Sequence, residues 1–391
     1  MMRRPVLVII APACLVGLAV LVATLSPHKW RLAEYEILAC AGLAYLAAIG
    51  RGRFRNMATV AASLALGLAA IEAVSAASVP DYAKTSKGLF VPDPVLGWRP
   101  AAPGVYHASR NDLDGKLIYD VDYTIDGNRL RQTLSGEAGP TIAFFGDSFT
   151  FGEGVNDADT LPQAFADVDG RRLRVLNFGF SGYGPQQFLR AVETGLFDPL
   201  LSGAKVFVLQ TSAWHAERTS CLVSFTLHAP RYVLQDGVPV YHGPCASGLM
   251  LHLKEFLYNS DTVRKFFVPA IAHLNGSDID LYVAEVIRAA QISTARYHVP
   301  TLVLYLPAGP AYLGNSGRTD ADIEAAFRKA GLPVLDGSVS AAQFPPGTAL
   351  TMAGDGHPTA IVQHARARML HDFMRAQFPA LLATEAAAAR D

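Results

Sequence analysis

Residues 141–155 read TIAFFGDSFTFGEGV, and this stretch decides the fold prediction. Its first part, TIAFFG (141–146), is a continuous apolar run closed by glycine, which is typical of a strand buried on both faces of a parallel sheet. Ser148 follows two residues after Gly146. The carboxyl ends of parallel strands are where such sheets hold their sites, so the Ser148 hydroxyl is expected in a cleft, with its own amide free to donate to an oxyanion. Taken alone, Gly-Asp-Ser is more typical of a plain turn.

The same rhythm of strand and helix continues toward the end of the chain. Helical patterns, such as 185–196 and 277–296, lie between further apolar runs. These runs are 172–179, 204–211, 298–307 and 332–337. Buried strands separated by helices predict a parallel sheet in a three-layer α/β fold.

A glycine-rich motif follows the second strand. LNFGFSGYGPQQ (176–187) brings Gly179, Gly182 and Gly184 together. Glycines let the backbone approach a ligand and present N–H groups to it. A strand-to-helix connection that needs positive φ would explain them equally well.

An acid–base pair precedes the last helix. AGDGHPTA (353–360) places Asp355 two residues before His357. A serine is a poor nucleophile until a base takes its proton, and the base needs an orienting acceptor. The spacing allows Asp355 to hold the imidazole while its other nitrogen faces Ser148; the alternative is a surface turn.

Together these three motifs resemble those of the SGNH, or GDSL-type, hydrolase superfamily over about residues 135–375, here as a membrane-anchored bacterial member. The resemblance implies a flavodoxin-like α/β/α domain with no metal and no nucleotide cofactor. It implies Ser148 as nucleophile, His357 as base and Asp355 as the residue that orients the base. It also implies the amides of Ser148 and Gly182 as oxyanion donors.

The motif that the family carries after its third strand is different in this chain. The family has Gly-x-Asn-Asp after the third strand, whereas this chain has Trp214-His215 in VLQTSAWHAERTSC. The Trp214 indole or the His215 imidazole would then replace the amide donor of the missing asparagine. The alternative is that Trp214 packs and His215 lies at the surface or supports other residues.

Two segments flank the alternating region. Residues 88–135 are rich in strand patterns and read as an antiparallel lead-in. Residues 219–275 interrupt the alternation as a cap insertion, with a hairpin that turns at Asp236-Gly237. Cys221 and Cys245 lie in this insertion, and a disulfide between them would suit an oxidising compartment; two free buried thiols are the alternative.

The first eighty residues hold three apolar runs, Val6–Leu25, Ile37–Ile49 and Met57–Ile71, which predict about three transmembrane helices. Arginines precede the first run and lie between the second and third, so both loops are expected in the cytoplasm and the rest of the chain outside it. A signal peptide in the first run or a re-entrant second run are the alternatives. The expected domains are residues 1–79 (membrane), 80–135 (linker and lead-in) and 136–380 (hydrolase-like).

Composition excludes several classes of protein. Hydrophobic residues make up 51% of the 391 residues and charged residues 17%, which rules out a disordered chain. The net charge of -1 leaves no basic surplus for nucleic acid. None of the four cysteines forms a CxxC pair, so no zinc or redox motif of that kind is expected.

These patterns predict a serine esterase for acyl or acetyl esters, held in a bacterial inner membrane with its catalytic domain in the periplasm. A first alternative is an O-acyltransferase acting on envelope or exported polysaccharide, since a sugar hydroxyl can replace water as the acceptor. A second is a non-catalytic binding or assembly module on a degenerate esterase fold, because the asparagine is missing. The expected partners are an acyl-ester substrate, with carbohydrate as one option, and the membrane.

Overall fold

The computed structural model describes residue 17 and residues 31–78, 88–112, 114–271 and 273–382. They group into two compact units. The first unit comprises Met1–Ala83, Leu113–Gly115 and His252–Ile271, and the second comprises Lys84–Asp112, Lys116–Leu251 and Ala272–Asp391. Each unit is described on its own.

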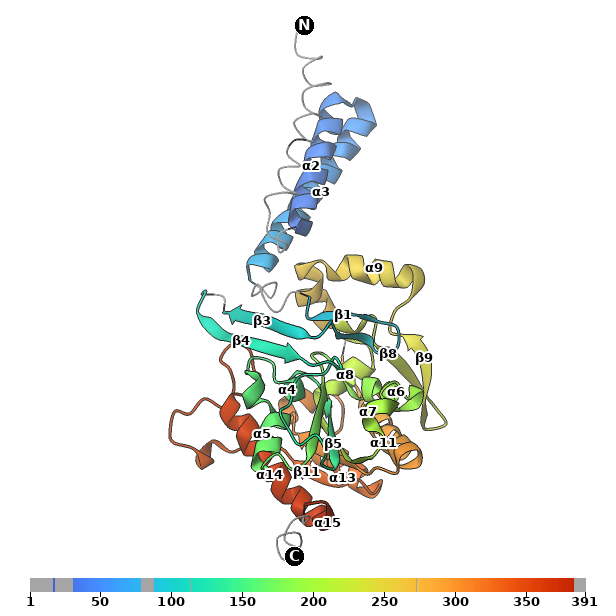
Figure 1. Cartoon of the computed structure of the whole chain (residues 1–391). Coiled ribbons are helices and arrows are strands. Elements are labelled where there is room, and N and C mark those ends of the chain that lie inside the picture. Colours follow the sequence, from blue (N-terminus) through green and yellow to red (C-terminus); the bar gives the residue numbers. More distant parts are fainter. Residues whose placement is uncertain (1–16, 18–30, 79–87, 113, 272, 383–391) are drawn as a thin grey trace, which may run out of the picture. The chain divides into compact units, whose positions relative to one another are not determined.

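Two long helices form most of the described part of the first unit. α2 (Arg31–Ile49) and α3 (Gly52–Ala77) are both long and apolar enough to cross a membrane (Figure 1). The alanines Ala58 and Ala62 of α3 are buried, and the Ala62 carbonyl accepts from Cys40 Sγ on α2 at 3.3 Å. Small residues therefore let the two helices pack closely. The second and third apolar runs are thus helices as predicted; the first run, Val6–Leu25, lies outside the described residues.

The second unit is built on a five-stranded parallel sheet with the strand order β11-β10-β7-β5-β6. The strands are β5 (Thr141–Gly146), β6 (Arg174–Gly179), β7 (Ala204–Ser212), β10 (Thr301–Leu306) and β11 (Val334–Asp336). All five predicted strands are present. Numbered along the chain, the order is 2-1-3-4-5 read from β6, which is the flavodoxin-like order that the sequence predicted.

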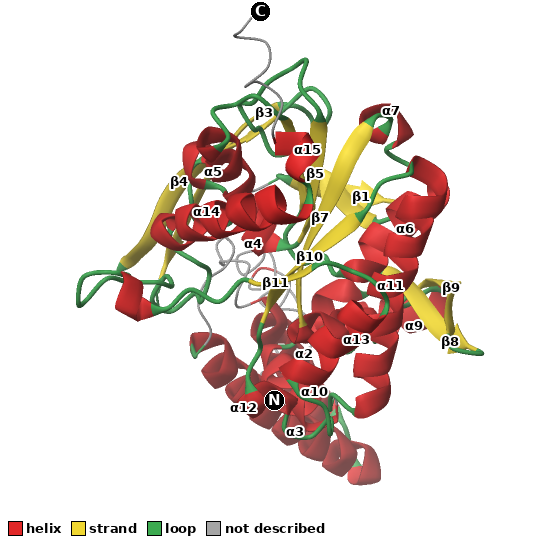
Figure 2. Cartoon of the chain, turned by 90° about the horizontal axis from the view of Figure 1, so that it is seen from below, coloured by secondary structure: helices red, strands yellow, loops and turns green. Residues whose placement is uncertain are grey.

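Helices cover both faces of the sheet (Figure 2). One face carries α5 (Leu161–Val168) and α14 (Ala360–Gln377); the other carries α6 (Pro185–Thr194), α11 (Gly276–Tyr297) and α13 (Asp320–Lys329). Side chains of a strand alternate between the two faces. Phe144 accordingly packs on Phe165 of α5 at 5.3 Å, while Phe145 packs on Phe188 of α6 at 4.3 Å between ring centroids. The fold is the expected three-layer α/β sandwich.

The segment before the sheet forms two antiparallel hairpins, as the β-rich pattern predicted. Their strands are β1 (Phe90–Asp93), β2 (Gly97–Pro100), β3 (Gly104–Asn111) and β4 (Leu117–Ile125). Arg131 joins this segment to the sheet through an isolated bridge to Asn177 of β6. Its buried guanidinium lies 4.3 Å from the centroid of the Tyr123 ring and donates to Asp157 Oδ1 at 2.7 Å. The lead-in is therefore part of the sheet unit.

The predicted insertion contains the hairpin of β8 (Pro230–Gln235) and β9 (Val238–Pro244), which turns at Asp236-Gly237 with positive φ at both residues. A disulfide joins Cys221 to Cys245 beside this hairpin. α9 (Gly248–Tyr258) follows it. The insertion is divided, because the hairpin belongs to the second unit and His252–Ile271 to the first. The short helices are α4 (Ser148–Phe151), α7 (Asp198–Leu201), α8 (Ala216–Thr219), α10 (Val268–Ile271), α12 (Pro310–Leu313) and α15 (Pro379–Leu382).

Candidate active site

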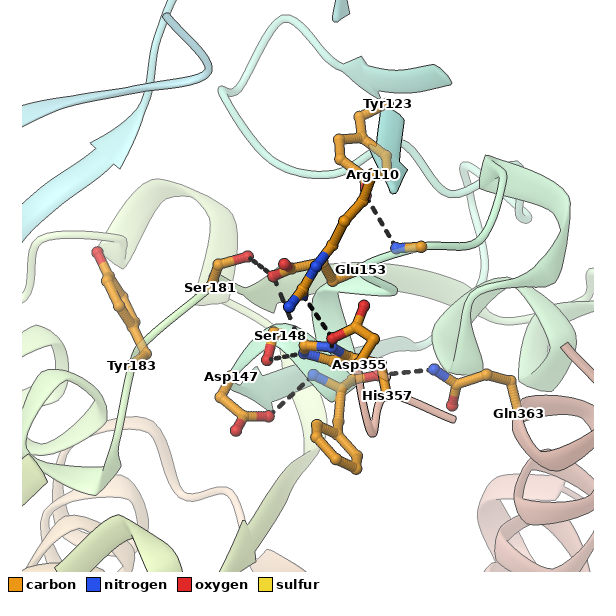
Figure 3. Close-up of polar contacts among 12 residues, drawn as sticks. Arg110, Tyr123, Asp147, Ser148, Glu153, Ser181, Tyr183, Asp355, His357 and Gln363 are labelled. Atoms are coloured by element: carbon orange, nitrogen blue, oxygen red, sulfur yellow. Dashed lines mark hydrogen bonds and ion pairs between the residues drawn. The ribbon is translucent and has the colours of Figure 1, made fainter. Parts of the chain in front are cut away.

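Ser148 lies directly beyond the carboxyl end of β5, the strand next to the centre of the sheet. Asp147 caps the short helix α4 by accepting from the Phe149 amide at 2.9 Å, and Ser148 is the first residue of that helix. The Ser148 hydroxyl lies 2.7 Å from Nε2 of His357 (Figure 3). The strand and its cap thus present the hydroxyl to the imidazole.

His357 is held from its other side by Asp355. Asp355 Oδ1 lies 2.7 Å from His357 Nδ1. A carboxylate can only accept, so Nδ1 carries the proton and Nε2 accepts from the Ser148 hydroxyl. The loop that holds both residues is closed by the Met352 amide, which donates to the His357 carbonyl at 2.8 Å. The structure therefore brings Ser148, His357 and Asp355 together in one hydrogen-bonded chain.

The Asp355 carboxylate has a cationic partner that sequence reasoning missed. Its side chain is only 1% exposed, and Arg110 of β3 donates to Oδ1 at 2.7 Å. A buried carboxylate needs such a partner because removing a charge from water is costly. Arg110 lies outside the region that resembles the hydrolase family, and no local pattern marks it among the other arginines.

Glu153 is a second carboxylate beside the imidazole. Its Oε2 lies 3.9 Å from His357 Nε2 and accepts from Ser181 Oγ at 2.8 Å. Burial alone would lower the pKa of His357, but the hydrogen bond to Asp355 and the negative charges of Glu153, Asp355 and Asp147 outweigh it, so this pKa lies above its ordinary value of 6.5. Sequence analysis did not single out Glu153. Its position five residues after Ser148, within the same motif, could have indicated that it lies near the site.

The two backbone amides that are expected to donate to an oxyanion have no other hydrogen-bond acceptor within the described residues. Among the residues that the structure describes, neither the Ser148 amide nor the Gly182 amide donates a hydrogen bond. Gly182 has a φ of +82°, and a Cβ there would lie 3.2 Å from the Trp98 ring and 3.3 Å from the Phe225 ring. Trp98 of β2 and Phe225 of the insertion therefore wall the space beside Gly182, which the sequence did not indicate.

Comparison with solved structures finds similar chain traces at low identity. A G-D-S-L family lipolytic protein from Desulfitobacterium hafniense is 10% identical, with 60% of this chain and 99% of that chain covered and a TM-score of 0.36. The psychrotrophic esterase EstA from Pseudoalteromonas sp. is 12% identical, with coverages of 61% and 98% and a TM-score of 0.38. A carbohydrate acetylesterase family member from Sinorhizobium meliloti is 12% identical, with coverages of 61% and 99% and a TM-score of 0.34. No protein-family model and no curated protein sequence matches the chain.

His215 does not face the space in front of Ser148, so the prediction that it donates to an oxyanion is wrong. It is 2% exposed, and its Nε2 donates to Asp147 Oδ2 at 3.0 Å. Its Nδ1 lies 2.9 Å from Thr211 Oγ1, which leaves neither ring nitrogen for a substrate. Burial and the charge of Arg218 lower the pKa of His215, so the ring is neutral.

Asp147 is instead the centre of a buried charge cluster. Its Oδ2 accepts from Arg218 Nη1 at 2.9 Å as well as from His215, and Arg218 also donates to the Tyr183 carbonyl. Burial opposes ionisation of Asp147, but Arg218 and His215 hold its pKa well below the usual range. This cluster joins the segments that follow β5, β6 and β7.

Trp214 lies near the site without a fixed partner for its indole. It is half-buried, and its ring lies 5.4 Å from Phe149, which in turn lies 5.2 Å from the His357 ring. Within the described residues its Nε1–H donates no hydrogen bond. The described residues also hold no group of three His, Cys, Asp or Glu side chains arranged as metal ligands.

The charge cluster leads to a stability prediction. Asp147→Ala leaves Arg218 without its carboxylate and removes the cap of α4, so unfolding should become easier by about 3 kcal/mol, the lower end of the range for breaking a buried pair. Replacing both partners, as Asp147→Ala with Arg218→Met, should recover part of that loss, because no unpaired charge remains.

The measurement is the thermal unfolding midpoint of the purified full chain in detergent. Asp372→Ala is the control, since its ion pair with Arg375 is exposed on both sides and should contribute less than about 1 kcal/mol. Equal shifts for Asp147→Ala and Asp372→Ala would contradict the assigned role of the cluster.

Proposed function

We propose that this protein is a serine ester hydrolase of the SGNH type. The observation that carries the proposal is the hydrogen-bonded chain from Ser148 Oγ through His357 to Asp355, at the carboxyl end of a central strand. A serine hydroxyl, a neutral imidazole and a buried carboxylate in this order are the parts that nucleophilic acyl transfer requires. The same assembled chain argues against a non-catalytic module.

The reaction follows from these positions. His357 Nε2 takes the proton of Ser148 as Oγ attacks the ester carbonyl, and the imidazolium that forms is stabilised by Asp355 and by the charge of Glu153. The tetrahedral intermediate collapses when His357 passes its proton to the leaving alcohol, which gives an acyl-enzyme. Water then enters, loses a proton to His357 and attacks the acyl carbonyl, and the acid leaves as Ser148 regains its proton.

The oxyanion that forms in each step needs donors already in place. The uncommitted amides of Ser148 and Gly182 supply two of them, and the free indole N–H of Trp214 is the proposed third. Fixed donors aimed at developing charge lower the barrier because they need no reorganisation during the reaction.

The second part of the proposal concerns membrane anchoring and cellular location. α2 and α3 are proposed to cross the inner membrane of a bacterium, with Arg51 between them and Arg53 and Arg55 at the start of α3 on the cytoplasmic side. The C-terminal end of α3 and the sheet unit then lie in the periplasm. The disulfide between Cys221 and Cys245 supports this side of the membrane, because disulfides persist in oxidising compartments.

The first test is turnover of short p-nitrophenyl esters by the full chain in detergent. Ser148→Ala should lower kcat by at least about 10⁴-fold, since triad nucleophiles act as a unit with their base. The same variant should lose labelling by a fluorophosphonate probe. Ser202→Ala, an exposed serine beyond α7, is the control that should keep both signals.

Turnover that survives in Ser148→Ala would refute the assignment of the nucleophile. Products are followed with and without an oligosaccharide acceptor, so that free acid is distinguished from acylated sugar. Acylated sugar as the main product would assign the chain to acyl transfer.

The pH dependence gives a second test. His357 must be neutral to act as base, so kcat/KM should rise with pH through a pKa above 6.5. Glu153→Gln removes a negative charge that favours the imidazolium, so this rise should move to lower pH. A charge at about 4 Å is worth about 1 kcal/mol even in bulk water, which corresponds to about 0.7 pH unit.

Asp372→Asn, which removes an exposed carboxylate elsewhere on the sheet unit, should leave the profile in place. A pH profile that is unchanged in Glu153→Gln would show that the charge of Glu153 does not raise the pKa of His357.

The third donor is tested through Trp214. Trp214→Phe keeps an aromatic ring against Phe149 and removes only the N–H, so kcat should fall by at least about tenfold with KM nearly unchanged. The fall is measured with the same esters. A change of less than a few fold would leave the two backbone amides as the complete oxyanion site.

A further inference from the structure

One part of the insertion exposes apolar side chains that no function described above uses. Five apolar residues of α9 are spaced so that they share one face of the helix. They are Leu249, Met250, Leu253, Phe256 and Leu257. These five side chains are between 40% and 85% exposed. In a soluble protein an apolar stripe of this kind normally packs against the protein core. Its exposure on α9 therefore indicates that this face binds another apolar surface.

The helical segment after α9 repeats the feature. It comprises a π-helical turn, Val263–Phe267, that runs directly into α10. Phe266 and Phe267 are 55% and 60% exposed. Arg264 and Lys265 stand beside them and are exposed too. Aromatic rings next to basic side chains are typical of a surface that lies among lipid headgroups.

The residues between these two segments are fixed to α3 within the same compact unit. The Glu72 carboxylate of α3 is buried and accepts from Ser260 Oγ at 2.7 Å and from the Asp261 amide at 2.6 Å. The Thr262 amide adds a third bond at 3.2 Å, and Thr262 Oγ1 donates to Ser75 Oγ at 3.1 Å. Glu72 thus caps the start of the segment that carries Phe266 and Phe267.

The position of Glu72 along α3 determines where residues 260–262 lie relative to the hydrocarbon of the membrane. The apolar run Met57–Ile71 ends one residue before Glu72, and α3 ends at Ala77. In a spanning α3, the hydrocarbon boundary therefore falls at Glu72, and the anchored residues 260–262 lie at that boundary. The exposed apolar side chains on either side of them are then held at the depth where acyl chains begin.

We propose that Leu253, Phe256, Leu257, Phe266 and Phe267 form an interfacial patch that binds the lipid of the periplasmic leaflet. The occupant is the bilayer itself: the apolar side chains enter the acyl-chain boundary, and the exposed Lys265 meets the phosphates of the headgroups, while Arg264 beside it pairs with Asp261. The inference rests on the proposed membrane span of α3. It extends that proposal, because it gives part of the predicted cap insertion, residues 253–267, a role at the membrane surface.

The test uses the full chain in vesicles of phosphatidylethanolamine and phosphatidylglycerol. In a background with Cys14→Ser and Cys40→Ser, which keeps the disulfide, single cysteines carry an environment-sensitive fluorophore at Leu253→Cys and Phe267→Cys. Glu255→Cys is the matched control, because two residues along a helix correspond to about 200° and Glu255 therefore lies on the opposite side of α9 from Leu253. Leu64→Cys reports the span of α3, and Arg328→Cys on α13 reports water.

Quenching by a nitroxide on the lipid acyl chain is compared with quenching by aqueous iodide. The Leu253 and Phe267 labels should be quenched several-fold more by the lipid nitroxide than the Glu255 and Arg328 labels, and should be shielded from iodide. Iodide quenching equal to that of the Arg328 label would overturn the patch. Protection from both quenchers would also overturn it, since protein, such as a second copy of the chain, would then cover the face.

The Leu64 label separates the two levels of the proposal. If it is quenched by lipid while the Leu253 and Phe267 labels are not, the span holds and only the patch is refuted. If it is not quenched by lipid, the span itself fails, and the patch fails with it.

Discussion

The buried charge of Asp355 is the constraint on which the site depends. A carboxylate that is 1% exposed needs a compensating cation, and that cation, Arg110, comes from a hairpin 245 residues earlier in the chain. The lead-in is therefore a working part of the site, although it lies outside the α/β sandwich. The buried Arg131, which bridges to Asn177 of β6 and donates to Asp157, holds this lead-in against the sheet and so keeps Arg110 in reach.

A second buried carboxylate with an arginine partner lies one residue before Ser148. Asp147 is buried and is balanced by Arg218, which also binds the Tyr183 carbonyl near Gly182. One ion pair therefore ties the end of β5 to the glycine-rich loop after β6 and to the turn after β7. Because the hydroxyl of Ser148 and the amide of Gly182 lie on these two tied segments, the cluster fixes the spacing between the proposed nucleophile and the proposed oxyanion donor.

The strands and the central hydrogen-bonded chain could be predicted because they are encoded locally. Continuous apolar runs predicted all five strands, and a serine after one strand with Asp-x-His before α14 predicted three residues that the structure brings together. Arg110 could not be predicted, since its partner lies far away in sequence and a lone arginine in a strand carries no signal. His215 was assigned to the wrong side, because Ala213–His215 is a 3₁₀ turn in which adjacent side chains point in different directions. The exposed stripe of α9 shows in the sequence as helical spacing, but spacing cannot tell whether a stripe faces a core or a membrane.

Segments outside the sheet border the proposed acyl site. Gly182 presents one proposed oxyanion donor, and the rings nearest to it are Trp98 from the lead-in and Phe225 from the insertion. Trp98 is held by its indole N–H, which donates to the Ser181 carbonyl at 3.0 Å, and by its edge contact with Tyr183. Phe225 is half-exposed and lies within the loop that begins at Cys221, so the disulfide to Cys245 limits how far it can move. One wall beside the site is therefore held by a hydrogen bond and a ring contact, and the other lies in a loop closed by a disulfide. Because disulfides persist only under oxidising conditions, the shape of the proposed acyl site depends on the compartment in which the chain folds.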